Sequence, residues 1–136
     1  MDKKINWAKS SDGVHEGYVN KDGDEVIATE FDFLLDQFVE GFAIARKDKR
    51  WGFVSLHGKV AVPLIYDNVS LFNEGIAKVK LAGKFGYVDT SGKVIVPIQY
   101  DDASDFNEGK AVVFANKKAG YIDKKGKVII PFQYDD

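Results

Sequence analysis

Residues 66–75 read YDNVSLFNEG, and residues 100–109 read YDDASDFNEG. A longer version, FDFLLDQFVEG, occupies residues 31–41. A segment that recurs after 34 residues indicates an internal repeat, and such a period decides the fold before any single element does. We call these three segments the joints. A joint is either a recurring chemical site or a structural connection between repeats.

The joints divide the chain into four repeats at residues 7–41, 42–75, 76–109 and 110–136, which we interpret as a single repeat domain covering residues 1–136. All three prolines fall at one repeat position, and most of the thirteen glycines fall at three others. Because proline and glycine have special backbone requirements, this regular spacing indicates a repeated backbone rather than a repeated chemistry.

The repeats are predicted to be β-structure. In the third repeat Ala77, Val79 and Leu81 alternate with Lys78 and Lys80, which is the two-residue period of a half-buried strand. Helical repeats of similar length exist. Three glycines and a proline in a typical repeat, however, leave no room for helices of ten residues or more.

Each repeat is expected to contain three strands joined by tight turns. In the third repeat we place them at residues 77–82, 85–90 and 94–97. Proline lacks the N–H that a β-ladder needs, so strand pairing is expected to end at Pro97. A glycine inside a strand marks a bulge or the close approach of another segment, so we expect a neighbouring aromatic side chain to lie across Gly86.

The predicted fold class is therefore all-β, a tandem array of about four three-stranded β-meander repeats of 34–35 residues. An open, solenoid-like stack is the first choice, and a closed, propeller-like ring is the alternative. Propeller blades usually have four strands, which favours the open stack.

Each joint contains two aromatic residues with acids between and after them. We expect Tyr100 and Phe106 to anchor the connection to the core, and the carboxylates of Asp32, Asp67 and Asp101 to accept backbone N–H groups of a turn. The alternative is a repeated metal or substrate site built from Asp67, Glu74, Asp101 and Glu108. Its presence in every joint favours the structural interpretation.

The complete repeat pattern runs from an aromatic-Gly pair through G-K-V and a proline to Y-D and F-x-E-G, as in RWGFVSLHGKVAVPLIYDNVSLFNEG at residues 50–75. It resembles the WG repeat, a short β-rich bacterial repeat, over nearly the whole chain. The first repeat departs from it, because Glu16 replaces the aromatic residue and Ala28 the proline, as in an atypical terminal cap. The resemblance implies an interaction scaffold without shared catalytic residues.

Composition excludes several kinds of chemistry. The chain has no cysteine, which excludes disulfides, thiolate nucleophiles and cysteine-ligated zinc. His57 falls at a hairpin turn, and His15 has no second ligand at metal-binding spacing. We therefore expect no enzymatic activity, no cofactor and no metal site. A net charge of −2 gives no global field that would attract DNA or RNA. With no membrane span and no signal peptide in the sequence, a cytoplasmic location is expected.

The first strand of each repeat has one constant and one variable face. The constant face, which we predict to be core, carries Ala43 and Ala45, Ala77 and Val79, and Ala111 and Val113. The variable face carries Ile44 and Arg46, Lys78 and Lys80, and Val112 and Phe114. On a repeat scaffold, the residues that determine binding are expected at the variable positions.

If successive meanders lie side by side, Arg46, Lys78 and Lys80 come together, joined by Arg50 and Trp51 of the adjoining hairpin. Cations next to an aromatic ring suit an anionic ligand or an acidic protein surface. The leading expectation is a protein partner, and an anionic small molecule or nucleotide is the alternative. A homo-oligomer also stays open. In the simplest interpretation these charges only keep an exposed strand face and edge in solution.

Overall fold

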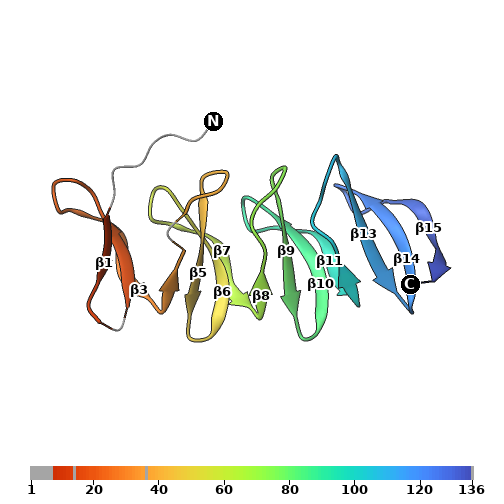
Figure 1. The fold of residues 1–136 in the computed structure, drawn as a ribbon, viewed down its shortest axis with the longest axis horizontal. Coiled ribbons are helices and arrows are strands. Elements are labelled where there is room, and N and C mark those ends of the chain that lie inside the picture. Colours follow the sequence, from red (N-terminus) through yellow and green to blue (C-terminus); the bar gives the residue numbers. More distant parts are fainter. Residues whose placement is uncertain (1–7, 14, 36, 136) are drawn as a thin grey trace. The chain divides into compact units, whose positions relative to one another are not determined.

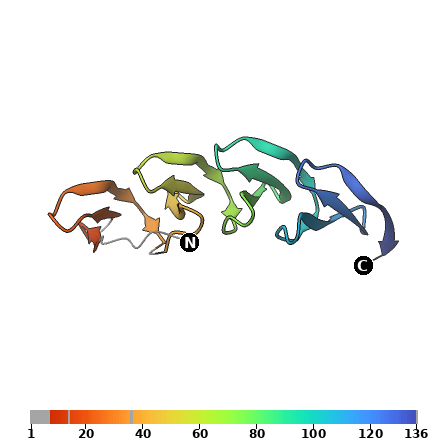
Figure 2. The same cartoon turned by 90° about the horizontal axis from the view of Figure 1, so that it is seen from above.

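The computed structural model describes residues 8–13, 15–35 and 37–135, and every element in that part of the chain is a β-strand. Among these residues there is no helix that is long and apolar enough to cross a membrane. The chain divides into two compact units, Met1–Ile65 and Tyr66–Asp136. The strands form four antiparallel sheets, none of which closes into a barrel (Figures 1 and 2). The predicted all-β tandem architecture is thereby confirmed.

The N-terminal unit contains the first two sheets. The first sheet has the order β1-β2-β3, with β1 at Ala8–Ser11, β2 at Glu16–Val19 and β3 at Glu25–Phe31. The second has the order β4-β5-β6-β7, with β4 at Phe33–Leu34, β5 at Phe42–Lys47, β6 at Arg50–Ser55 and β7 at Val60–Tyr66.

The C-terminal unit contains the other two sheets. The third sheet has the order β11-β10-β9-β8, with β8 at Asn68–Val69, β9 at Ile76–Leu81, β10 at Lys84–Asp89 and β11 at Val94–Tyr100. The fourth has the order β12-β13-β14-β15, with β12 at Asp102–Ala103, β13 at Lys110–Ala115, β14 at Lys118–Asp123 and β15 at Val128–Asp135.

The predicted three-stranded meander is present in every repeat, and the joints add a fourth strand. Each joint contributes two residues, β4, β8 or β12, that pair with the first long strand of the following repeat. Because this short strand lies at the edge of its sheet, it covers hydrogen-bonding groups that would otherwise be open to edge-to-edge association.

Each unit has its own hydrophobic core between its two sheets. In the C-terminal unit the core consists of Ile76, Tyr87, Val96, Tyr100, Ala103, Phe106, Ala111, Val113 and Ile122. In the N-terminal unit it consists of Tyr18, Ile27, Phe31, Leu34, Ala43, Ala45 and Val54. All six side chains of the constant strand face are buried, which confirms their predicted place in the core. Both joint aromatics, Tyr100 and Phe106, also anchor there as predicted.

In the third repeat the glycine of the aromatic-Gly pair, Gly86, lies opposite the segment with Pro97 at a β-bulge. Phe85 pairs with Tyr100 and Tyr87 pairs with Val96, so Gly86 alone faces the stretch of β11 that contains Pro97. The expected end of pairing at Pro97 was therefore wrong, because the bulge places proline where no ladder N–H is required and the strand continues to Tyr100.

The expected aromatic neighbour of the glycine was also wrong. The atoms that a side chain at Gly86 would meet first belong to Ile98 and to the backbone of Val96. At Gly52, the corresponding glycine of the second repeat, they are backbone atoms of Val62 and Pro63. Glycine is needed because the bulged strand bends across it and leaves no space for a Cβ atom.

The joint aspartates close the hairpin turns that follow them. The carboxylate of Asp32 accepts the backbone N–H of Asp48 at 2.7 Å. Asp67 accepts the N–H of Ala82 in the same way, and Asp101 that of Asn116. Both central residues of these two-residue turns have positive φ, for example 53° at Asp48, as a type I′ hairpin requires. The structural interpretation of these three carboxylates is thus confirmed.

We predict that Gly52→Ala destabilises the protein far more than Gly41→Ala. A Cβ at position 52 would lie 2.4 Å from the carbonyl oxygen of Val62, whereas at position 41 nothing lies within 4 Å and only the φ of +88° is unfavourable. The expected losses in the free energy of unfolding are about 3 kcal/mol at position 52 and about 1 kcal/mol at position 41. Urea unfolding followed by tryptophan fluorescence measures both, and equal losses would contradict the bulge argument.

Candidate functional site

The variable strand face continues across each sheet as a row of paired residues, which we call the cross-strand row. In the second sheet the row is Phe33, Arg46 and Trp51. In the third it is Asn68, Lys80 and Phe85, and in the fourth it is Asp102, Phe114 and Ala119. Directly opposed residues of antiparallel strands point to the same face, so each row forms one continuous strip of side chains. The backbone of the row repeats, while its side chains differ from sheet to sheet: the second and third sheets each place a cation beside an aromatic ring, and the fourth does not.

The third sheet brings two lysines onto one aromatic ring. The Nζ atoms of Lys78 and Lys80 lie 5.5 and 5.4 Å from the ring centre of Phe85. Beside them is a hollow of about 280 Å³, whose wall also includes Asn68 and Ser70 of the preceding joint. Both lysines were predicted site residues, and the structure places them together.

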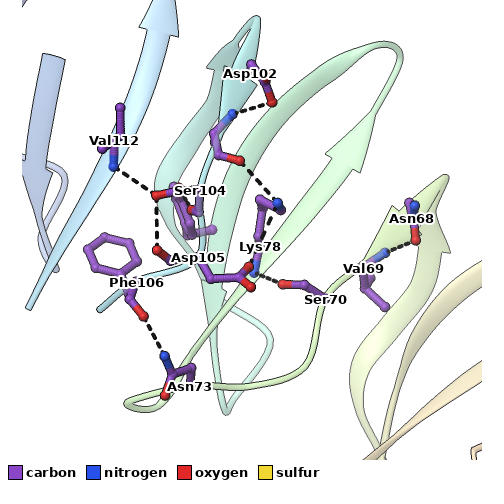
Figure 3. A network of polar contacts seen from close by, with 12 residues as sticks. Asn68, Val69, Ser70, Asn73, Lys78, Asp102, Ser104, Asp105, Phe106 and Val112 are labelled. Atoms are coloured by element: carbon purple, nitrogen blue, oxygen red, sulfur yellow. Dashed lines mark hydrogen bonds and ion pairs between the residues drawn. The ribbon is translucent and has the colours of Figure 1, made fainter. Parts of the chain in front are cut away.

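The two lysines differ in what else they contact. Lys78 Nζ donates a hydrogen bond to the carbonyl oxygen of Ala103 at 3.1 Å and lies 3.8 Å from the carboxylate of Asp105, as Figure 3 shows. Lys80 Nζ makes no hydrogen bond or ion pair with any residue that the structure describes. Lys78 therefore connects strand β9 to the joint at residues 100–109, whereas the ammonium group of Lys80 contacts the ring of Phe85.

The N-terminal unit carries an analogous arrangement. The guanidinium carbon of Arg46 lies 5.3 Å from the ring centre of Trp51. Phe33 meets the same indole edge-on, with ring centres 5.6 Å apart. The Nε atom of Arg46 is buried and has no hydrogen-bond partner. An arginine beside an indole is the strongest common form of cation–π contact.

The predicted site residues thus fall into two groups. Arg46 and Trp51 are paired across β5 and β6 in the N-terminal unit, with Arg50 next to Trp51 on β6. Lys78 and Lys80 form the second group, in the C-terminal unit. The convergence of both groups on one surface stays a prediction.

Sequence reasoning missed the aromatic partner of the lysines. Phe85 occupies the repeat position of Trp51, and a glycine follows each of them. Aligning the repeats would therefore have identified Phe85 as the aromatic residue next to the lysines. Phe33 and Asn68 were missed because the joints were expected to be loops, and only strand pairing places them in the cross-strand row.

One of the joint glutamates, Glu74, binds backbone groups of the next joint. The carboxylate of Glu74 accepts the N–H groups of Glu108 and Gly109 at 2.7 and 2.9 Å, and Lys124 Nζ lies 3.3 Å away. Within the described residues no group of three or more His, Cys, Asp or Glu side chains is arranged to hold a metal ion. Glu74 therefore connects one joint to the next, which supports the structural interpretation over the alternative of a metal or substrate site.

Hydrogen bonds of this kind lower the pKa of two joint carboxyls, Glu74 and Asp101. The N–H of Gly109, helped by Lys124, lowers the pKa of Glu74 from its ordinary value of 4.5. The hydrogen bond from Lys84 lowers the pKa of Asp101 in the same direction, and the N–H of Asn116 adds to it. A carboxylate held in its charged form by such partners contributes to the stability of the fold.

Both histidines use their backbone N–H groups in local hydrogen bonds. The backbone N–H of His57 bonds the Ser55 hydroxyl within the turn between β6 and β7. The backbone N–H of His15 bonds the carboxylate of Asp12 at 2.6 Å. Both histidines are thus found where the repeat pattern predicted turns or polar surface.

The sequence pattern of the WG containing repeat matches residues 17–51, 51–85, 85–118 and 120–136. The chain belongs to this family. No curated protein sequence matches it. The four matches begin at the aromatic-Gly pair, at Trp51 and Phe85 in two of them and at Gly17 and Gly120 in the others. In the third repeat the structure places the glycine of this pair, Gly86, opposite the bulge.

The departure of the first WG repeat from the pattern also has a structural counterpart. Glu16, which stands where Trp51 and Phe85 stand in later WG repeats, accepts the backbone N–H of Leu34 at 2.9 Å. The phenol of Tyr18 donates to the carbonyl oxygen of Leu35 at 2.7 Å. A carboxylate thus replaces the aromatic ring and fixes the following joint by a hydrogen bond.

We predict different consequences for removing the two lysines. Lys78→Ala removes the hydrogen bond to Ala103, so the free energy of unfolding should fall by about 1 kcal/mol. Lys80→Ala removes no such bond and should change it by less than about 0.5 kcal/mol. Chemical unfolding of the two variants side by side checks this, and an equal loss would show that Lys80 is also structural.

We also predict that Glu74→Gln reduces the loss of stability in acid. Because the folded-state pKa of Glu74 is lowered, its contribution is complete above about 4.5 and is lost as the pH falls through the folded value. Urea unfolding between about pH 5 and pH 3 should therefore show a shallower decline for the variant than for the wild type.

The matched control for this experiment is Glu108→Gln, one repeat further along. The carboxylate of Glu108 accepts no hydrogen bond from the residues that the structure describes. A decline as shallow in this control as in Glu74→Gln would assign the effect to charge in general and not to the bond between joints.

Proposed function

We propose that this WG-repeat chain is a non-enzymatic binding module that presents its variable β-faces to a protein partner. The observation that carries the proposal is the cross-strand row, in which one repeated backbone displays Phe33, Arg46 and Trp51 in the second sheet and Asn68, Lys80 and Phe85 in the third. A scaffold whose exposed chemistry changes while its core stays constant is suited to recognition.

The charges of the row favour an acidic segment on the partner. The chain as a whole has a net charge of −2, so it does not attract acidic partners by its overall charge. Such attraction requires a local cation whose charge is not neutralised by an ion pair. Lys80 is such a cation, held against Phe85 and facing the hollow. The ammonium group can pair with a carboxylate of the partner, and the aromatic ring beside it can pack against the partner's backbone or apolar side chains.

A small anionic ligand, such as a nucleotide or another phosphate-bearing metabolite, is the second candidate. The hollow of about 280 Å³ beside Lys78 and Lys80 favours it, because a surface used only for protein contact does not require a concavity. The ring of Phe85 would offer a planar base a face on which to stack.

The variant Lys80→Glu tests whether the surface around Lys80 binds an acidic ligand or only contacts solvent. We expect a fluorescein-labelled oligoglutamate peptide, used as the acidic probe, to bind the wild type and to lose about tenfold or more in affinity with this variant. The control is Lys118→Glu, which makes the same charge change at an exposed position of the same unit and should leave binding unchanged. Fluorescence anisotropy at two salt concentrations gives the affinities.

The two candidate functions, binding of a protein partner and binding of a small anion, predict different molecules bound to the protein when it is purified from cells. Capture from a lysate of the source organism with the wild type and both variants should yield proteins that Lys80→Glu loses and Lys118→Glu keeps. An added mass of a few hundred daltons in native mass spectrometry, lost with Lys80→Glu, would instead support the small anion. Identical behaviour of the two variants in all of these measurements would show that the Lys80 surface is not the binding site.

A further inference from the structure

The hollow of the third sheet presents hydrogen-bond donors and no carboxylate. The polar side chains that line it are Asn68, Ser70, Lys78 and Lys80. They bring one amide, one hydroxyl and two ammonium groups to its wall. No aspartate or glutamate is among the described residues that line it. Because an ammonium group has three donors and no acceptor, the hollow suits a ligand that is rich in acceptor atoms.

The acceptor atoms of the amide and the hydroxyl are already used by the backbone. Asn68 Oδ1 accepts the N–H of Val69 at 2.8 Å, and Ser70 Oγ accepts the N–H of Lys78 at 3.2 Å (Figure 3). Neither the amide nitrogen of Asn68 nor the hydroxyl of Ser70 donates a hydrogen bond within the part of the chain that the structure describes. The groups left for a ligand are therefore mainly donors, which fits an oxyanion.

The two lysines supply the positive charge. Lys78 Nζ donates to the carbonyl oxygen of Ala103 and lies 3.8 Å from the carboxylate of Asp105, whose side chain is 57% exposed. An ion pair of this length and exposure contributes little, so a stronger anion can replace it. Lys80 Nζ rests on the ring of Phe85 and forms no ion pair with a described residue. Both ammonium groups can therefore bind one ligand.

The fourth sheet has the same backbone frame without these donors. Asp102, 34 residues after Asn68, accepts the N–H of Ala103 at 2.8 Å through Oδ1. Ser104 Oγ likewise accepts the N–H of Val112 at 3.0 Å. The two lysine positions carry apolar residues in this repeat. Since the frame forms without an amide or a lysine, these groups of the third sheet are not needed by the backbone and are a local addition to it.

The size and charge of the hollow suit a phosphoryl group. Pockets for whole small molecules usually measure about 300–1,000 Å³. This hollow, at about 280 Å³, lies just below that range and suits one group of a larger ligand. A phosphoryl group carries close to two negative charges at neutral pH and three strong acceptor oxygens. It can use both ammonium groups and the neutral donors at once, whereas a carboxylate has one charge and two oxygens.

We propose that this hollow is a phosphoryl-binding subsite, which holds the phosphate monoester of a phosphorylated side chain on the protein partner. The inference rests on the proposed function, because it specifies which group of the partner the Lys80 surface recognises. Two phosphate oxygens pair with the ammonium groups of Lys78 and Lys80. The third accepts the donors of Asn68 and Ser70. The segment that carries the phosphate packs on the ring of Phe85.

A titration of the full ¹⁵N-labelled chain with two matched peptides tests this subsite. Both peptides are short, capped at their ends and otherwise uncharged, and they differ at one position, which is phosphoserine in one and glutamate in the other. We expect the phosphoserine peptide to give saturable shifts at Ser70, Lys80 and Phe85. It should bind about tenfold or more tightly than the glutamate peptide, because the phosphoryl group brings a second charge and a third oxygen.

Asn68→Asp is the most informative variant, because the fold already accommodates this residue at Asp102 of the next joint. It keeps the acceptor for the N–H of Val69, removes the amide donors and adds a negative charge. The affinity for the phosphoserine peptide should therefore fall by about tenfold or more. The matched control is Asn107→Asp, the same change at an exposed position outside the hollow, which should leave the affinity unchanged.

The outcomes separate this subsite from the proposed function. Equal affinities for the two peptides, both lost with Lys80→Glu, would overturn the phosphoryl subsite and leave the acidic protein partner in place. No saturable shift with either peptide at millimolar concentration would overturn both. Tighter binding of adenosine monophosphate than of the phosphoserine peptide would overturn the assignment to a protein segment. Equal losses with Asn68→Asp and Asn107→Asp would show that net charge, and not the hollow, governs binding.

Discussion

The structure depends on carboxylates that bind the backbone N–H groups of tight turns. Such turns need positive φ at two successive residues, a costly conformation for residues other than glycine. At Asp48 and Asn116 this conformation is held by a joint aspartate from the preceding segment, and at Glu108 by Glu74. Because each bond joins segments of different repeats, the acids of the joints both stabilise the turns and connect neighbouring meanders.

This use of the acids gives two of the repeated carboxylates, Glu74 and Asp101, a structural role. Glu74 and Asp101 have lowered pKa values because N–H groups and lysines hold them in the charged form. A carboxyl that acts as a general acid at neutral pH needs the opposite shift. The constant positions of the joints therefore carry structure, whereas the cross-strand row, with Arg46 on Trp51 and Lys80 on Phe85, differs between the sheets.

Sequence reasoning succeeded where the pattern is local. The two-residue alternation at Ala77 and Val79 identified strands and a buried face, and the spacing of Tyr100 and Phe106 identified the core anchors. It predicted a bulge or a close approach at Gly86 correctly, but it failed at the aromatic neighbour expected across Gly86 and at the end of pairing expected at Pro97. Proline looks the same in the sequence at a strand end and in a bulge, and the neighbours of the bulge depend on the pairing of two strands. The joint strands were missed since two residues are too few to show a period.

The sequence by itself determined the repeat, the strand faces, the turns and the family, because each depends on spacing and on the backbone needs of glycine, proline and aspartate. Only the tertiary structure decided which of the two lysines, Lys78 or Lys80, forms a hydrogen bond with the joint. Lys78 and Lys80 share one strand face, yet the first bonds Ala103 of the next joint and the second rests on Phe85 without an acidic partner among the described residues. Their different contacts arise from where the joint folds against strand β9, which no periodicity along the chain encodes.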